Sequence, residues 1–261
     1  MNNTSETVGR QLREWRQRRR LSQLALASEA EISQRHLSFV ESGRARPSRD
    51  MVLLLSEYLD VPLRARNTML TAAGHAPHYP HHRLDTPEQS GMRGMIEKVL
   101  HGHLPHPALA VDRHWGLICA NAAAQRLMSD AAPHLLTGEV NVLRLSLHPE
   151  GLAPRILNLA EWRAHLLNRL DHDISYSADA RLAQLRDELA AYPVSGPGGN
   201  LASDAAQAGS IAIPLRLKAD AGPLSFLSTT TVFGTAVDVS LSEVTIEAFF
   251  PADDRTAQAL A

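Results

Sequence analysis

The first 75 residues of the chain break into short helical patterns with clear start and stop signals. Ser22 and Ser33 stand directly before two of these patterns, where an N-cap side chain accepts amide hydrogen bonds. Gly43 follows the third pattern, at the kind of position where helices end in a left-handed residue. Helices are therefore expected to begin near residues 8, 22, 33, 47 and 62, the last one running to Gly74. Five short helices in this length predict a compact all-α domain over residues 1–75.

The second and third patterns share an apolar face that suits two short helices packed at a steep angle. Its members are Leu24, Ala27, Ile32, Leu37 and Val40. Ala27 is small at the position where the two helices would cross closely. In such a pair the second helix projects its first turn outward, and a turn of this kind can enter the major groove of DNA.

Charge is divided unevenly along the chain. Residues 1–80 hold 12 Arg and no Lys against 8 acidic residues, a net charge of +4, whereas the remainder of the chain carries −6. A basic N-terminal part joined to an acidic remainder predicts two modules with different partners.

Residues 21–48 resemble the helix-turn-helix of Xre-family regulators, which is the phage-repressor type. The matching positions are Leu21, Ser22, Gln23, Ala27, Ile32, Ser33, Leu37, Glu41, Gly43, Pro47 and Ser48. The resemblance implies a lambda-repressor-like domain that binds a double-stranded DNA operator. It also implies an ion pair between Glu41 and an Arg of the first helix, for which Arg16 stands at the matching offset.

The resemblance places base-reading residues at the start of the third helix. Gln34, Arg35 and Ser38 would face base edges there. Gln suits adenine and Arg suits guanine, because each side chain can form two hydrogen bonds with that base in the major groove.

Other residues of the same segment are expected to meet the DNA backbone. Ser33 would cap the third helix or contact a phosphate, and Gln23 would bind phosphate at the N-terminus of the preceding helix. Arg44 and Arg46 in the following loop would add contacts that position the protein without specifying a sequence. The alternative is a generic helical bundle whose basic face is merely solvated.

Residues 76–91 read as a linker, because they are rich in Pro, His and Gly and show no hydrophobic period. Beyond them, helices are expected at 92–103 and 122–129, and one long helical stretch at 153–191. Residues 192–209 read as a loop. Strands are expected at 108–112, 114–121, 210–218, 224–233 and 243–250. The second domain is thus predicted to be α+β, with an antiparallel sheet split around a helical middle.

Residues 92–255 resemble the MmyB-like ligand-binding domain that commonly follows an Xre-type DNA reader. The resemblance is carried by residues 106–115, 120–123 and 141–149, and by the end of the chain at 224–253. It implies a PAS-like fold and a fatty-acid-like ligand. The expected domains are therefore a DNA-binding domain at 1–75, a linker at 76–91 and a ligand-binding domain at 92–255.

A small sheet backed by helices can leave an apolar pocket with few polar anchors. Candidate lining residues are Leu109, Val111, Trp115, Ile118, Phe226 and Val232, about half of which should face inward because strand side chains alternate. Arg144 could hold a ligand carboxylate with two hydrogen bonds, or could instead form a structural salt bridge. Asn121 follows a strand and is expected to cap the next helix.

The sequence offers no catalytic set and no expected cofactor beyond a bound apolar molecule. The single cysteine, Cys119, excludes an intrachain disulfide and a Cys-based zinc cluster. Histidines gather at 78–82 and 101–106, but they lie in or beside a Pro-rich loop and no i,i+4 pair stands on a helix, so no metal site is expected. Neither a signal peptide nor a membrane span is evident, which predicts a cytoplasmic protein.

Together these features predict a bacterial transcription regulator, rather than an enzyme, that is modulated by a small apolar ligand. A homodimer is expected, since one recognition helix covers few base pairs and a palindromic operator supplies two half-sites. The alternative is a DNA-binding regulator whose second domain is a ligand-free module for dimerisation or for a partner protein.

Overall fold

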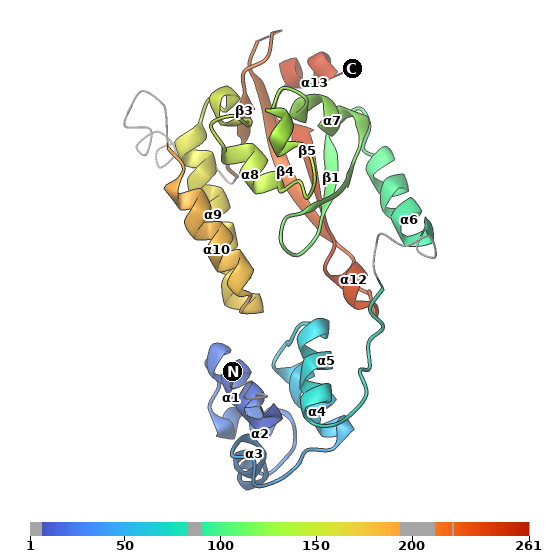
Figure 1. Cartoon of the computed structure of the whole chain (residues 1–261), viewed down its shortest axis with the longest axis vertical. Coiled ribbons are helices and arrows are strands. Elements are labelled where there is room, and N and C mark those ends of the chain that lie inside the picture. Colours follow the sequence, from blue (N-terminus) through green and yellow to red (C-terminus); the bar gives the residue numbers. More distant parts are fainter. Residues whose placement is uncertain (1–6, 83–89, 194–211, 221, 261) are drawn as a thin grey trace. The chain divides into compact units, whose positions relative to one another are not determined.

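The computed structural model describes residues 7–82, 90–193, 212–220 and 222–260, and the chain divides into two compact units (Figure 1). Unit 1 contains Met1–His82 together with a second segment, Thr235–Ser242. Unit 2 contains Arg83–Gly234 and Glu243–Ala261. The second segment of unit 1 interrupts the chain of unit 2, which the sequence did not indicate.

The five predicted N-terminal helices are present. They are α1 (Val8–Arg18), α2 (Gln23–Glu29), α3 (Gln34–Glu41), α4 (Arg49–Tyr58) and α5 (Leu63–Ala72). Ser22, Ser33 and Ser48 cap α2, α3 and α4, and each hydroxyl accepts from the amide three residues further on. Gly43 follows α3 with φ of +75°, the left-handed conformation expected of it.

The core of unit 1 is formed by apolar residues from all five helices, and Leu12, Leu26, Leu37 and Leu55 are fully buried. Leu24 does not belong to it, because 63% of this residue is exposed. At about 100° per residue, a position two before Leu26 faces the opposite side of the helix. The predicted apolar face is therefore confirmed at Ala27, Ile32, Leu37 and Val40, and the prediction is wrong at Leu24.

The first half of the predicted linker packs along α5. The Asn67 side chain forms three hydrogen bonds with this segment: Oδ1 accepts from the amides of His78 and Tyr79 at 2.9 and 3.0 Å, and Nδ2 donates to the Tyr79 carbonyl at 2.7 Å. Residues 83–89 of the linker lie outside the described residues.

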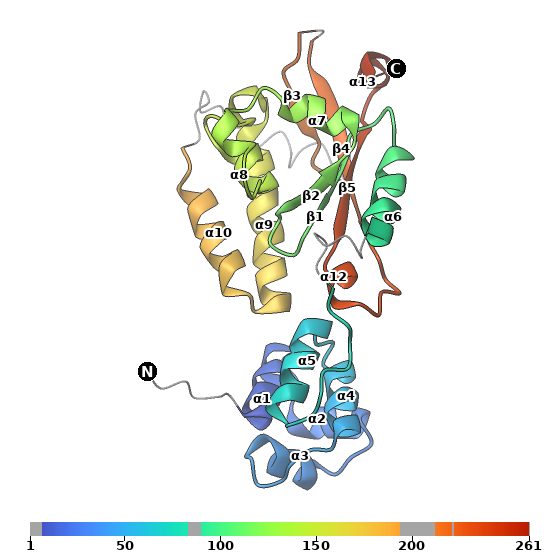
Figure 2. The ribbon, with the colours of Figure 1, turned by 45° about the vertical axis from the view of Figure 1, so that its right-hand side comes forward.

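Unit 2 is built on a five-stranded antiparallel sheet of order β2-β1-β5-β4-β3 (Figure 2). The strands are β1 (Ala108–Val111), β2 (Leu117–Ala120), β3 (Leu215–Leu217), β4 (Leu224–Val232) and β5 (Thr245–Pro251). The predicted α+β class and antiparallel sheet are confirmed. β3 is shorter than the expected strand at 210–218, whose first two residues lie outside the described part of the chain.

The two faces of the sheet carry separate cores, because successive strand residues point to opposite sides. Ala108 and Ala110 of β1 pack with Ile246 of β5 and with Ile96 of α6 (Ser90–His101). Leu109 and Val111 belong to the larger core on the other face, which is covered by four further helices. These helices are α7 (Ala122–Met128), α8 (Val142–Leu147), α9 (Leu159–Ser177) and α10 (Ala180–Ala191). Asn121 caps α7 as expected, and its Oδ1 also accepts from the amide of Ala108.

The long helical stretch predicted at 153–191 is not continuous. It contains a short 3-10 helix at Ala153–Arg155, and then α9 and α10, which pack against each other. Ala178 ends α9 in a left-handed conformation with φ of 61°, and Asp179 caps α10. The break escaped prediction because this junction carries neither Gly nor Pro. Most of the expected loop at 192–209 lies outside the described residues.

Candidate nucleic-acid interface and ligand pocket

The start of α3 presents the predicted base-reading side chains to solvent. Gln34 and Arg35 are exposed and Ser38 is half-buried, while the Ser33 hydroxyl is occupied as an acceptor for the His36 amide at 3.1 Å. The Arg35 guanidinium carbon lies 5.4 Å from the centre of the Phe39 ring, one turn further along the helix. This contact is a cation–π pair that limits the directions available to Arg35.

A buried ion pair holds the helix-turn-helix together, as the family resemblance implied. Arg16 Nε and Nη2 donate to Glu41 Oε1 and Oε2 at 2.6 and 2.9 Å, and Nη1 donates to the Leu21 carbonyl at 2.8 Å. The hydrogen bond to Glu41 raises the pKa of Arg16. Gln23 joins the same network, because its Nε2 donates to Glu41 Oε2 at 2.8 Å. Gln23 thus links α2 to α1 and α3, in addition to its predicted phosphate contact.

The two predicted phosphate-binding arginines of the loop differ in their contacts. Arg44 is exposed and its guanidinium carbon lies 5.9 Å from the Phe39 ring, on which Arg35 also stacks. Arg46 donates through Nε and Nη2 to the Ala73 carbonyl at 3.1 and 2.9 Å, which ties the loop to the end of α5. Sequence reasoning missed Phe39, although an aromatic residue four positions after Arg35 on a helix is a recognisable signal.

Unit 2 contains an apolar pocket between the sheet and α7, α8 and α9. It is lined by Pro107, Leu109, Trp115, Ala124, Leu127, Met128, Val142, Leu143, Leu145, Ser146, Leu152, Trp162, Leu166, Arg169, Leu215, Leu217, Ser228, Glu247 and Phe249. The cavity volume is about 90 Å³. Ligand pockets are typically about 300–1,000 Å³. The side chains that line this pocket therefore fill most of the space that a ligand would need.

The predicted ligand residues divide between the pocket and other places. Leu109 and Trp115 line it. Val111 and Phe226 belong to the surrounding core without lining the cavity, whereas Ile118 packs with the smaller core beside α6. Val232 is 60% exposed near the end of β4.

Arg144 also lies outside the pocket wall. It forms two hydrogen bonds with Glu188 on α10, Nε to Oε1 at 2.7 Å and Nη2 to Oε2 at 2.8 Å. The hydrogen bond to Glu188 raises the pKa of Arg144. This geometry corresponds to the structural salt bridge that the sequence left open as the alternative.

The charged side chains that do line the pocket are Arg169 and Glu247, among the described residues. Arg169 Nη1 and Nη2 donate to Glu247 Oε2 and Oε1 at 2.9 and 2.6 Å, and Nη2 also donates to Thr230 Oγ1 at 2.9 Å. The Arg169 guanidinium carbon stacks 4.5 Å from the Trp115 ring centre. Sequence reasoning missed this pair because 78 positions separate its members, although an Arg beside the buried stripe of α9 was a usable signal.

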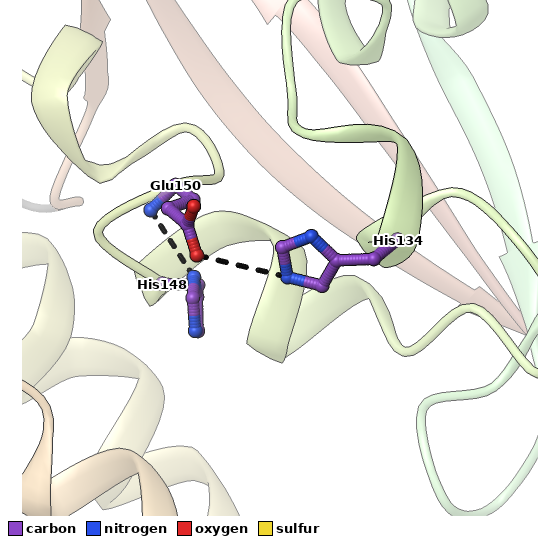
Figure 3. Close-up of side chains that lie close together, drawn as sticks. All are labelled: His134, His148 and Glu150. Atoms are coloured by element: carbon purple, nitrogen blue, oxygen red, sulfur yellow. Dashed lines mark hydrogen bonds and ion pairs between the residues drawn. The ribbon is translucent and has the colours of Figure 1, made fainter.

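Outside the pocket, His134, His148 and Glu150 form a group with potential metal-ligating atoms within 4.8 Å of one another (Figure 3). His134 Nε2 lies 3.8 Å from Glu150 Oε2, and His148 Nδ1 accepts from the Glu150 amide at 3.1 Å. Two imidazoles and a carboxylate are donor types that suit zinc. However, His134 and Glu150 are exposed, and the backbone already occupies Nδ1 of His148. None of the three belongs to the His-rich segments noted in the sequence.

The two units define the class of protein: a capped helix-turn-helix joined to an α+β domain with an apolar pocket. Comparison with protein-family models also finds two domains, although the second match includes Thr235–Ser242, which belongs to unit 1. Residues 12–65 match a helix-turn-helix family, and residues 92–261 match the MmyB-like transcription regulator ligand binding domain. The chain belongs to this MmyB-like family, and it is a DNA-binding transcription regulator. A comparison with curated proteins returned no match. Within the described residues, no helix has the length and apolar character required to cross a membrane.

Proposed function

We propose that a small apolar, fatty-acid-like molecule enters the pocket of unit 2 and thereby changes the affinity of the chain for its DNA operator. The observation that supports this proposal is that β4 and β5 line the pocket and are joined through a segment of the DNA-binding unit. Both strands contribute to the pocket wall, through Ser228 on β4 and Glu247 and Phe249 on β5. The connection between them contains Thr235–Ser242, which belongs to the DNA-binding unit.

Specific contacts fix this connection within unit 1. Its short helix α12 (Val239–Ser242) follows Asp238, whose Oδ2 lies 2.6 Å from His82 Nδ1. The Val239 amide donates to the Pro80 carbonyl at 2.9 Å, and the Ser240 hydroxyl donates to the His82 carbonyl. A shift of β4 or β5 on ligand entry would therefore act directly on the segment packed along α5. Ligand control of DNA binding requires that the ligand stabilises one conformation of the chain more than another, and that the two conformations differ in their affinity for DNA.

The DNA-binding half of the proposal assigns Gln34, Arg35 and Ser38 to base edges, with Arg44 and Gln23 at phosphates. It also assigns the working species as a homodimer on a palindromic operator with half-sites about 10 base pairs apart. The exposure of Gln34 and Arg35 at the first turn of α3 supports this assignment, because a recognition helix reads bases with its N-terminal residues.

Operator affinity measured with and without ligand tests the regulatory proposal. The operator is selected from random duplexes with the full chain, and affinities are then measured against fatty acids and fatty alcohols of about eight to fourteen carbons, a size range that suits pockets of this class. We expect at least one compound to change operator affinity by about fivefold or more, the usual range of allosteric coupling. Unchanged affinity across the whole panel would end the proposal of lipid control.

The small cavity favours a second candidate function, in which unit 2 is a dimerisation or partner-protein module with a filled core. A volume of about 90 Å³ holds no acyl chain without movement of its walls. Native mass spectrometry of the purified chain separates the two functions: extra mass that is lost on delipidation supports a ligand pocket, whereas a bare dimer mass supports the filled module.

A further inference from the structure

The polar end of the pocket is an ion pair rather than a lone cation. Glu247 is buried and accepts two hydrogen bonds from Arg169, the only cationic side chain among the described residues of the pocket wall. These two bonds and the one to Thr230 use three of the five N–H donors of the guanidinium. The pair therefore carries no net charge, yet it can still donate to and accept from a ligand atom.

Two titratable groups of α9 lie one helical turn on either side of Arg169. Asp173 lies one turn after Arg169 on α9, and burial raises the pKa of this carboxyl, against the opposing charge of Arg169 and a hydrogen bond with Trp115. His165 lies one turn before Arg169, and burial together with the charge of Arg169 lowers its pKa, so that the ring favours its neutral form. Neither of these two neighbours therefore adds positive charge beside Arg169.

A ligand carboxylate would be poorly stabilised in this setting. To bind Arg169 with two hydrogen bonds it would have to displace Glu247, and a buried carboxylate deprived of its partner is costly. If Glu247 stayed in place, the ligand charge would lie close to like charge at low dielectric. A hydroxyl or carbonyl group carries neither penalty, because it needs only hydrogen bonds from the pair.

We infer that the pocket selects a neutral amphiphile, an aliphatic chain ending in a hydroxyl, ester or amide group, over a free fatty acid. This inference rests on the proposed ligand function. It adds the chemistry of the ligand's head group, which the apolar residues of the pocket wall do not select. Arg169 and Glu247 are the residues that determine which head group is preferred. The Trp115 ring stacks against the Arg169 guanidinium and holds it in place.

Two probes with the same chain length, n-octanol and octanoate, test the inference on the full-length protein. Binding is measured by titration calorimetry at about pH 7.5, where octanoate is ionised. We expect n-octanol to bind at least about tenfold more tightly. Octanoate binding equally or more tightly would overturn the head-group inference and leave ligand control standing. Failure of both probes, and of longer alcohols and acids, would overturn the two together.

The variant Glu247→Gln tests the origin of the preference, because it removes the negative member of the pair and leaves Arg169 uncompensated. We expect the ratio of n-octanol to octanoate affinity to fall by about tenfold or more. Glu188→Gln is the matched control, since Glu188 also binds an Arg through two hydrogen bonds but lies outside the pocket wall. An equal fall in both variants contradicts the assignment. The wild-type comparison decides the inference by itself if Glu247→Gln does not fold.

Discussion

Arg16 and Glu41 illustrate how much of the DNA-binding unit depends on single side chains. Only 10% and 2% of their side chains are exposed, and together with Gln23 they join the first three helices. A buried pair of this kind adds little net free energy compared with well-packed apolar residues, but removal of one partner leaves a charge without compensation. The pair therefore fixes the geometry of the helix-turn-helix more than it adds to its stability.

Glu41→Ala should accordingly lower the free energy of unfolding by about 3–5 kcal/mol, because Arg16 remains buried and unpaired. Urea unfolding followed by circular dichroism measures the loss, and hydrogen exchange in peptides from α1 and α3 locates it. Glu14→Ala is the control. Its partner Arg10 is exposed on the same helix, and such pairs contribute no more than about 0.5 kcal/mol. Similar losses in the two variants would show that the buried pair has no special structural role.

Substitutions of the exposed Arg35 and Arg44 should distinguish base recognition from sequence-independent binding to the DNA backbone. We expect Arg35→Ala to lose about 1–3 kcal/mol on the selected operator and to relax specificity at one position. Arg44→Ala should weaken binding to all duplexes alike and reduce the slope of log affinity against log salt by about one. Equal losses on operator and random DNA for Arg35→Ala would contradict its assignment to a base edge.

His165 predicts a pH dependence for unit 2. Burial, with the charge of Arg169, lowers its folded-state pKa from 6.5. The unfolded chain therefore takes up this proton first as the pH falls, so the free energy of unfolding decreases below about pH 6.5. His165→Gln should flatten this dependence between about pH 7.5 and 5.5, as measured by urea midpoints across that range. A dependence of unchanged steepness in the variant would rule out His165 as its source.

Among the secondary-structure elements, the α9–α10 hairpin depends on one residue with an unfavourable backbone conformation. Ala178 adopts φ of 61°, and its amide donates to the Ile174 carbonyl at the end of α9. The adjacent Asp179 accepts from the Arg181 amide at the start of α10 and lies 2.8 Å from His114 Nε2. The cap and the left-handed residue together turn the chain back on itself, so that α10 packs along α9.

Ala178→Gly should raise the free energy of unfolding by about 0.5–1 kcal/mol, because glycine adopts the left-handed conformation without the steric cost that alanine pays. Ala164→Gly is the matched control, an exposed alanine inside α9, and it should lose about 1 kcal/mol. Urea midpoints of the two variants and the wild type give the comparison. Destabilisation by both substitutions would mean that the hairpin does not require this conformation.

At the scale of the whole molecule, the proposed ligand control would act through the second segment of unit 1, which lies in the chain between β4 and β5. Asp238 caps α12 through Oδ1, which accepts from the amides of Ser240 and Leu241 at 2.8 and 3.1 Å, and it contacts His82 through Oδ2. Loss of this one side chain would loosen the attachment of Thr235–Ser242 to the linker segment without touching α3 or the pocket wall.

Asp238→Ala should therefore reduce the effect of a ligand on operator affinity, while the ligand and the operator each still bind. The measurement is operator affinity with and without the most effective compound of the panel, and ligand binding is followed separately by calorimetry. Asp253→Ala is the control, because Asp253 likewise accepts from a backbone amide, that of Thr256, at the start of α13 (Asp254–Leu260), which packs on β4 and β5. Full ligand response in Asp238→Ala would exclude this route.

The sequence by itself determined the features that depend on local order along the chain. Helix caps, the left-handed Gly43 and the alternation of strand residues each act over a few positions, so Ser22, Ser33 and Asn121 could be assigned correctly, and the family resemblance added the pair of Arg16 with Glu41. Only the tertiary structure decided which distant residues meet. It brought Glu247 to Arg169, placed Arg144 on the surface with Glu188, and attached Thr235–Ser242 to the DNA-binding unit. Such contacts follow from how strands and helices stack in three dimensions, and a single sequence carries no local signal of that stacking.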